Sequence, residues 1–425
     1  MKSNNPPSSG ETTGDIRSIP SKIIEGVFSV NWVHIGIVGV IPLIGVAGSF
    51  WVPLQIKTAI WTLFYTIVTT LGVTTGYHRL WAHRSYSATT SLRVILAALG
   101  TSTAQDTIVK WCRDHRAHHR YVDQEEDPYN IKKGFFHAHI GWLLFKRERS
   151  KIGWQDMSDL FDDAVVRWQR RYYAPLVVLT GFVLPAVVAE LGWADGWGGL
   201  IYAGFLRIFV IQQGTFCTNS VAHYFGDQPF QSQNSPRNNF WFALVSFGEG
   251  YHNFHHEFPK DYRNGVYWYD FDPSKWAIWI WCQLGLASGL HRFPENEIRK
   301  TRLQQSQKCL EKDLDKIEWG TPLDELPILE WKECLERSEQ GDKIMAIDGI
   351  VYEVSEFIKH HPGGEHILSG LGKDATAMFN GQIYNHSTAA RNLLSTMRIA
   401  RVKSQQTKTF DNEKRGGIRM PRRRS

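Results

Sequence analysis

The stretch EGYHNFHHEFP (residues 249–259) carries three histidines within five residues. Its HxxHH spacing recurs in HRAHH (residues 115–119), and a looser pair occurs in HRLWAH (residues 78–83). On an α-helix, residues at positions i, i+3 and i+4 share one face, so each HxxHH run can direct its imidazoles to one point. Imidazole is the commonest metal ligand among side chains. The pattern therefore predicts a histidine-ligated metal site.

The hydrophobic residues are segregated along the 425-residue chain, although they make up only 43% of it. Four apolar stretches approach the ~20 residues that a helix needs to cross a bilayer. These stretches are residues 30–50, 58–75, 174–191 and 200–221. They form two hairpins with short connections that contain Trp but no Lys or Arg, whereas residues 78–171 contain sixteen Lys and Arg. The positive-inside rule then places this middle segment, both termini and all the histidine runs in the cytosol.

Two shorter apolar runs, residues 92–99 and 276–281, cannot span a bilayer, so we expect them at its interface. The whole chain has a net charge of only +6, which argues against a nucleic-acid partner. Its five scattered cysteines favour a reducing compartment. The first 27 residues are polar and predict a disordered tail, and residues 403–425 form a basic tail.

The candidate metal ligands number nine imidazoles and one amide at the cytosolic ends of the hairpins. They are His78, His83, His115, His118, His119, His223, His252, His255 and His256, with Asn219 one turn before His223. Nine imidazoles are too many for one metal and natural for two. Nitrogen ligation without thiolate suits iron, zinc or copper, and the HExxH motif of zinc hydrolases is absent. Iron with O2 is the usual biological means of attacking an unactivated C–H bond, and the adjacent spans favour a lipid substrate.

A second domain provides a candidate electron carrier. After a charged helical linker at residues 294–323, a compact unit at residues 324–402 contains HHPGG, with His361, and later Asn385-His386-Ser387. The glycines permit a sharp turn that can present His361 to one face of a haem, with His386 on the other face. Two axial imidazoles leave no position vacant, which is typical of electron transfer.

The motifs HRLWAH, WCRDHRAHHRYVDQEEDPYN, TNSVAHYFG and GEGYHNFHHEFPKDYRNG resemble those of the fungal acyl-CoA Δ9 desaturases, and DGIVYEVSEFIKHHPGG resembles cytochrome b5. The resemblance covers roughly residues 28–400. It implies a mainly α fold: a four-span helical membrane domain (residues 28–293) with a cytosolic histidine cap, and a small α+β haem domain. It also implies that the nine histidines bind two irons, with Asn219 acting through a water, and that His361 and His386 are the axial ligands of haem b. The assignment of each histidine to an iron stays open, and zinc can replace iron in a purified sample.

The resemblance further implies insertion of a cis double bond into palmitoyl- or stearoyl-CoA at the endoplasmic reticulum membrane. O2 would be reduced to two waters, and two electrons would come from NADH through a separate cytochrome b5 reductase and the fused haem. By family match, Arg113, Lys146 and Arg147 would bind the CoA phosphates, and Thr66 and Thr70 would line the end of the acyl tunnel.

Three other histidines, His34, His137 and His139, are expected to have packing or hydrogen-bonding roles. Two alternative functions stay open. The closer one is a di-iron lipid hydroxylase, a sterol oxidase or a desaturase of other regiochemistry. The more distant one is a non-enzymatic membrane protein that binds zinc or haem.

Overall fold

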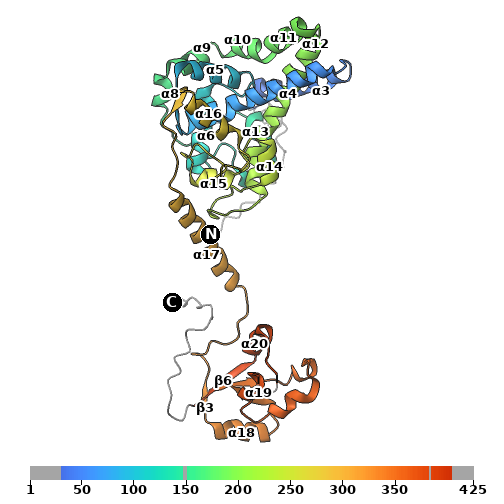
Figure 1. Cartoon of the computed structure of the whole chain (residues 1–425), viewed down its shortest axis with the longest axis vertical. Helices are drawn as coiled ribbons and strands as arrows, with labels where there is room; N and C mark the ends of the chain where they lie inside the picture. Colours follow the sequence, from blue (N-terminus) through green and yellow to red (C-terminus); the bar gives the residue numbers. More distant parts are fainter. Residues whose placement is uncertain (1–29, 147–150, 382–383, 404–425) are drawn as a thin grey trace, which may run out of the picture. The chain divides into compact units, whose positions relative to one another are not determined.

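The computed structural model describes residues 30–146, 151–381 and 384–403. The chain divides into two compact units, residues 1–306 and 307–425 (Figure 1). The predicted N-terminal tail and nearly all of the basic C-terminal tail lie outside the described residues. Each unit is considered below by itself.

Among the described residues of the first unit, four helices are long and apolar enough to cross a membrane, with mean hydropathies between 1.3 and 2.0. The first comprises α2 (Trp32–Ile35), η1 (Gly36–Val40) and α3 (Ile41–Ser49); the second, α4 (Ile56–Leu71) and η2 (Gly72–Ala82); the third, α10 (Tyr173–Val178), η6 (Leu179–Val183) and α11 (Leu184–Trp193); the fourth, α12 (Gly196–Gly198), η7 (Gly199–Leu206) and α13 (Arg207–Tyr224). The η segments named here are π-helical. The prediction of a four-span helical membrane unit is confirmed.

The second and fourth spans extend beyond the apolar stretches seen in the sequence. His78 lies within η2 and His223 within α13, so both belong to the spanning helices rather than to the loops after them. A helix continues through these polar residues because both side chains are buried and their ring nitrogens have partners inside the protein. The spans thereby hold the two histidines rigidly.

A set of hydrogen bonds joins the second and third spans at the end opposite these histidines. The chain turns at Ala194, which adopts a left-handed conformation with φ of 54°. Asp195 then accepts hydrogen bonds from the Gly198 N–H and from the Thr58 hydroxyl, which itself accepts one from the Trp193 indole at 2.8 Å. These bonds satisfy buried polar groups in the short connection and fix the pairing of the two hairpins.

Arg207 is a fully buried cation at the centre of the bundle, with 1% of its surface exposed. Its guanidinium donates to Thr69 of α4 at 2.9 Å, to the carbonyl of Ser102 at 3.0 Å and to the carbonyl of Gly181 in η6 at 3.4 Å. The Tyr65 ring lies 4.5 Å from it. A charge is tolerated among apolar helices only when it is bonded in this way, so Arg207 ties four segments of the chain together.

The remaining elements of the first unit form a cap over the ends of the spans. They are β1 (Ser87–Ala88), α5 (Thr90–Thr101), α6 (Ile108–Tyr121), η3 (Ile131–Lys133), η4 (His137–Gly141), α7 (Trp142–Leu144), α8 (Ser158–Asp162), α9 (Ala164–Arg171), α14 (Phe240–Val245), α15 (His252–Glu257), α16 (Pro273–Gln283), β2 (Ala287–Ser288) and the first part of α17 (Glu295–Leu314). Antiparallel pairing of β1 with β2 closes the cap. Its main core packs η2, α5, α6 and α16 around Tyr77, Leu96, Ile108 and Ile278.

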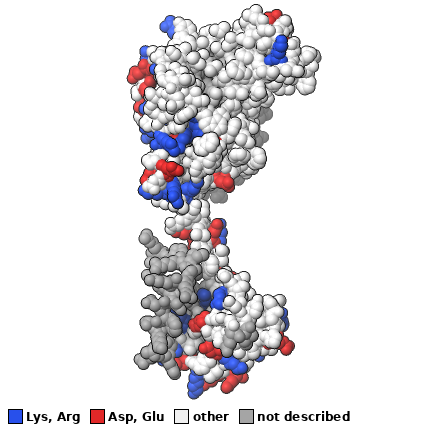
Figure 2. All heavy atoms as spheres, viewed as in Figure 1, with Lys and Arg blue, Asp and Glu red and all other residues white. Residues whose placement is uncertain are grey.

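Charge is unevenly distributed on the first unit (Figure 2). On the face shown, the region of α3, α4, α10 and α11 is nearly free of charged side chains, whereas Lys, Arg, Asp and Glu gather over the cap. This distribution matches apolar helices in lipid beneath a cap in water.

The second unit contains a small mixed sheet covered by short helices. Its elements are β3 (Ile328–Leu329), α18 (Trp331–Glu339), β4 (Ile344–Ile347), β5 (Ile350–Glu353), η8 (Ile358–His360), η9 (Gly364–Gly370), α19 (Thr376–Phe379), α20 (Thr388–Ser395) and β6 (Arg398–Val402). The strand order is β3-β6-β5-β4, with β3 parallel to β6 and the other pairs antiparallel. The predicted small α+β unit is confirmed.

Candidate metal and haem sites

The nine predicted histidine ligands gather into two groups inside the cap. The first group contains five residues: His78, His83, His115, His119 and His255. The second contains four: His118, His223, His252 and His256. Within each group, one ring nitrogen of every member lies within 4.8 Å of the others. All nine histidines predicted as ligands therefore lie at two neighbouring points.

Each HxxHH helix is shared between the two groups instead of serving one point. In α6, His115 and His119 join the first group and His118 joins the second. In α15 the division is reversed, because His255 alone joins the first group. Residues i and i+4 differ by only ~40° around a helix, whereas i+3 lies ~100° from i+4. The (i, i+4) pair thus reaches one point and the i+3 residue the other.

The spacing of the ring nitrogens fits metal coordination. The Nε2 atoms of His78 and His255 are 2.9 Å apart, those of His83 and His115 2.8 Å, and those of His223 and His252 3.0 Å. Two nitrogens bound at ~2.1 Å to one metal at right angles are ~3 Å apart. The observed distances therefore match neighbouring ligands of a single ion.

Several outer ring nitrogens are already committed to acceptors. His78 Nδ1 lies 3.0 Å from Glu249 Oε2, and His118 Nδ1 lies 2.9 Å from Asp127 Oδ1. The proton on each Nδ1 leaves a lone pair on Nε2, which points into its group. The buried Nε2 atom of His118 has no hydrogen-bond partner among the described residues. An orphaned lone pair of this kind is the arrangement that a bound cation satisfies.

The environment also keeps several of these imidazoles unprotonated. Burial, reinforced by neighbouring imidazoles, lowers the pKa of His115, His119 and His256 well below the usual range. Burial likewise lowers the pKa of His252 to about 3. Neutral imidazole is the form that binds metals, so these four histidines are ready to act as ligands at neutral pH.

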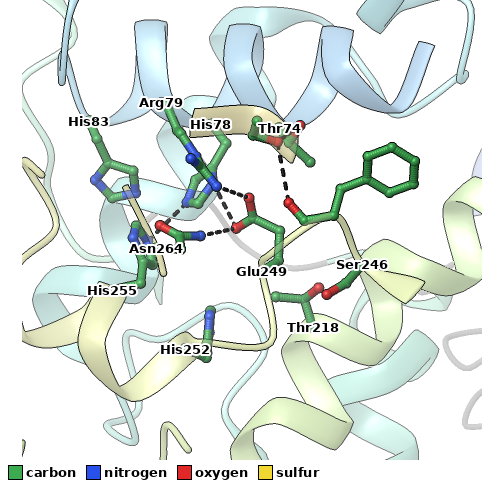
Figure 3. Close-up of polar contacts among 12 residues, drawn as sticks. Thr74, His78, Arg79, His83, Thr218, Ser246, Glu249, His252, His255 and Asn264 are labelled. Atoms are coloured by element: carbon green, nitrogen blue, oxygen red, sulfur yellow. Dashed lines mark hydrogen bonds and ion pairs between the residues drawn. The ribbon is translucent and has the colours of Figure 1, made fainter. Parts of the chain in front are cut away.

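Glu249 is a site residue that sequence reasoning missed (Figure 3). It is 6% exposed and accepts hydrogen bonds from His78, from Arg79 Nη2 at 3.2 Å and from Asn264 Nδ2 at 2.9 Å. Burial opposes its ionisation, but His78 and Arg79 lower the pKa of Glu249 to about 2. An acidic residue three positions before a histidine run was the signal available in the sequence.

Asp127 plays the corresponding part for the second group and was also missed. It lies nine residues after His118 and is 1% exposed. A third outer contact joins His223 Nδ1 to the Ser235 hydroxyl at 2.7 Å, and that hydroxyl in turn donates to Asp123. In each histidine group, the outer nitrogen of at least one imidazole is therefore bonded to a carboxylate, either directly or through one hydroxyl.

In the second unit, His361 and His386 face each other across a narrow gap. Their ring centroids are 6.4 Å apart with the planes tilted by 30°. Imidazoles bound at ~2 Å on opposite sides of one iron have centroids ~6 Å apart. His361 Nδ1 lies 3.2 Å from the Gly364 carbonyl and His386 Nδ1 3.0 Å from the Phe379 carbonyl. The two residues thus fit the axial ligation of a haem.

Comparison with known proteins gives the family of each unit. The family model "Fatty acid desaturase" matches residues 56–279, more than half of the chain. The chain belongs to the fatty acid desaturase family. A second model, "Cytochrome b5-like Heme/Steroid binding domain", matches residues 330–403 of the desaturase. The predicted desaturase-class oxidoreductase with a C-terminal cytochrome b5 domain is therefore confirmed, and that domain implies haem.

Similar curated proteins align with most of the desaturase chain. It is 46% identical over 375 residues to the "Probable acyl-CoA desaturase" of Schizosaccharomyces pombe, covering 88% of this chain and 78% of that protein. It is 45% identical over 377 residues to "Acyl-CoA desaturase 1" of Saccharomyces cerevisiae, covering 88% and 74%. It is 41% identical over 280 residues to "Stearoyl-CoA desaturase 5" of Bos taurus, covering 64% and 84%.

Asn219 is buried on α13 of the desaturase, one turn before His223. His223 belongs to the four-histidine group, and the role of Asn219 through a water stays a prediction. His139 lies outside both groups, with its ring nitrogens 2.9 Å from the Ser220 hydroxyl and 3.1 Å from Gln213 Oε1. His34 lies 2.8 Å from Asp106. These contacts agree with packing and hydrogen-bonding roles for His139 and His34.

The substrate residues predicted for the desaturase have mixed surroundings. Arg113 on α6 is half-buried and paired with Asp114, while Lys146 is exposed. Arg147 lies outside the described residues. Thr66 and Thr70 are half-buried on α4, and the Thr66 hydroxyl donates to the Thr62 carbonyl at 2.7 Å, one turn earlier. The roles of these five residues in binding CoA or ending the tunnel stay predictions.

Proposed function

We propose that this desaturase inserts a cis double bond at the Δ9 position of a saturated fatty acyl-CoA such as palmitoyl- or stearoyl-CoA. The observation that carries the proposal is the pair of histidine groups, seven of whose nine members are buried, at the ends of apolar spanning helices. A mid-chain methylene has no acidic proton and no leaving group, so acid–base catalysis cannot begin the reaction. The names of the aligned relatives support the acyl-CoA substrate.

Two irons are the proposed metals. The five-histidine group would hold one of them, and the four-histidine group, completed by Asn219 through a water, would hold the other. When bound, the irons supply the oxidising chemistry by which O2 removes two neighbouring hydrogens and is itself reduced to two waters. The surrounding residues bury most of these side chains, and this burial lowers the pKa of His115 and His255 well below the usual range.

That reaction consumes two electrons and two protons beyond those taken from the substrate. We propose that NADH supplies the electrons through a separate cytochrome b5 reductase, and that the haem held by His361 and His386 relays them singly. A haem with two axial imidazoles is suited to this role because it has no open position for O2.

The acyl chain would enter an apolar tunnel that holds one C–C bond beside the irons, a positioning effect. Arg113, Lys146 and Arg147 would bind the CoA phosphates in the cytosol, since phosphates favour Arg and Lys. Thr66 and Thr70 would limit chain length. The enzyme would reside in the endoplasmic reticulum membrane with its termini and histidines on the cytosolic side.

Expression in a yeast strain that requires unsaturated fatty acids tests the proposal. We expect growth without supplement, with Δ9 16:1 and 18:1 products identified by gas chromatography and by mapping of the double bond. A His119→Ala variant expressed at the same level is the control. Hydroxylated lipids or a double bond elsewhere would replace the proposal with a related di-iron activity, and failure to bind any metal would remove the whole class.

A further inference from the structure

Each histidine group contains one ligand whose outer nitrogen is bonded to a buried carboxylate. Glu249 contacts His78 of the five-histidine group, and Asp127 contacts His118 of the four-histidine group. The exposed fractions of the two carboxylates are 6% and 1%. Burying a carboxylate is costly unless its oxygens accept hydrogen bonds. The hydrogen bonds around each carboxylate therefore indicate its role.

Glu249 is fixed by three donors from two parts of the chain, η2 and the loop that contains Asn264 (Figure 3). Its Oε1 accepts from Arg79, and its Oε2 accepts from both His78 and Asn264. Arg79 is itself held by the Tyr262 carbonyl at 2.8 Å and by Asp272 Oδ1 at 2.9 Å. Glu249 therefore cannot rotate away from His78 without breaking two other hydrogen bonds.

Asp127 is fixed mainly by backbone groups. Its Oδ1 accepts from His118 Nδ1 and from the Tyr129 N–H at 3.1 Å, and its Oδ2 accepts from the Asp123 N–H at 3.1 Å. The turn that follows α6 thus aims one oxygen at His118. The two carboxylates come from unrelated segments, yet each contacts the Nδ1 atom of one histidine in its group. Side-chain packing alone would not be expected to produce the same contact twice.

We propose that Glu249 and Asp127 are positioning residues, one for each metal centre, which hold His78 and His118 in the tautomer that presents the Nε2 lone pair to the metal. The inference rests on the proposed metal-binding function and extends it. A carboxylate behind a ligating imidazole fixes the ring and raises its basicity, and losing one typically weakens metal binding by ~10–100-fold. Glu249 also connects the first histidine run to the third, because it precedes His252 by three residues and bonds His78.

The two positions make the test selective. Glu249→Gln and Asp127→Asn keep the size of each side chain and remove its charge. We expect Glu249→Gln to lose the metal of the five-histidine centre first and Asp127→Asn that of the four-histidine centre. Each variant should therefore retain about one metal per chain at a chelator concentration that leaves two in the parent enzyme, with a ~10–100-fold increase in the dissociation constant of the weakened centre.

Asp261→Asn is the matched control. Asp261 is a buried carboxylate of the same cap, 1% exposed, and it binds Arg263 and the Phe293 N–H. Metal per chain is measured by mass spectrometry after dialysis of the full-length, detergent-solubilised protein against graded EDTA. Size-exclusion chromatography establishes that each variant is folded, and the control should keep both metals.

Asn264→Ala provides a milder test that leaves both carboxylates in place. It removes one of the three donors to Glu249, so release of one metal to the chelator should accelerate several-fold without loss of folding. Unchanged metal retention in Glu249→Gln and Asp127→Asn, or equal loss of both metals in each, would overturn the inference. A parent enzyme that binds no metal would instead refute the proposed function.

Discussion

The rings of His119 and His256 stack with their centroids 4.0 Å apart and their planes inclined by 12°, although the two residues belong to different histidine groups. His119 comes from α6 and His256 from α15. This ring contact joins the two histidine groups, so two bound metals would be neighbours. Two metals held close together can act on one substrate.

Replacing either His119 or His256 should abolish desaturation. His119→Ala leaves four imidazoles in its group, and His256→Ala leaves three in the other. We expect each variant to insert into the membrane normally and to lose activity by at least ~100-fold, with the larger loss of bound metal in His256→Ala. Product chromatography and metal content measure the effect, and a fully active variant would exclude that histidine from the site.

A histidine outside the groups should behave differently. His139 bonds Ser220 and Gln213 and contacts no member of either group through its ring nitrogens. His139→Ala should therefore retain much of the activity and both metals, with a loss of ~1–2 kcal/mol of stability from the unpaired partners. Complete inactivation at normal expression would show that His139 has a direct role.

Chain-length selection provides a test of α4. If Thr66 and Thr70 line the end of the tunnel, the bulk of Trp in Thr70→Trp should shift preference from 18-carbon toward 16-carbon or shorter substrates. The double bond should stay at the same distance from the thioester, because the metals do not move. Competition between palmitoyl- and stearoyl-CoA measures the ratio, and an unchanged ratio would place the tunnel end elsewhere.

The haem domain can be tested through one axial ligand. His361→Ala should lose the haem absorbance, because one remaining imidazole does not hold it in a site built for two. Activity should collapse while both metals of the first unit are retained. Free cytochrome b5 added in trans should restore it only in part, because the fused domain acts at an effective concentration in the ~mM range.

The result that would count against a relay through the haem is full activity of His361→Ala in cells that lack free cytochrome b5. Rescue by the free protein should also weaken at high salt if charged surfaces guide the encounter, because salt screens them.

HxxHH spacing predicted six of the nine imidazoles, and the other three came from the looser HRLWAH pair and from the position of His223 after the fourth apolar stretch. These patterns and the long apolar runs that predicted the four spans are local features of the sequence. The division of His118 from His115 was not predictable in that way. It depends on a second point of convergence, which only the tertiary arrangement of α6 and α15 creates. Glu249 was missed because an acidic residue near a histidine run is common and its partner, His78, lies far away in sequence. Asp127 is only nine residues from His118, but it lies beyond the end of α6, so helical spacing does not reveal the contact.

Arg207 has a consequence for how the protein is made. A guanidinium at the centre of a lone helix costs about 2.5–3.5 kcal/mol on insertion into lipid. Its acceptors Thr69, Ser102 and Gly181 all lie earlier in the chain. A ribosome therefore delivers the fourth span after every partner of its charge has been synthesised. The fourth span can therefore pair its charge with acceptors that have already been synthesised, so the order of synthesis itself favours correct assembly.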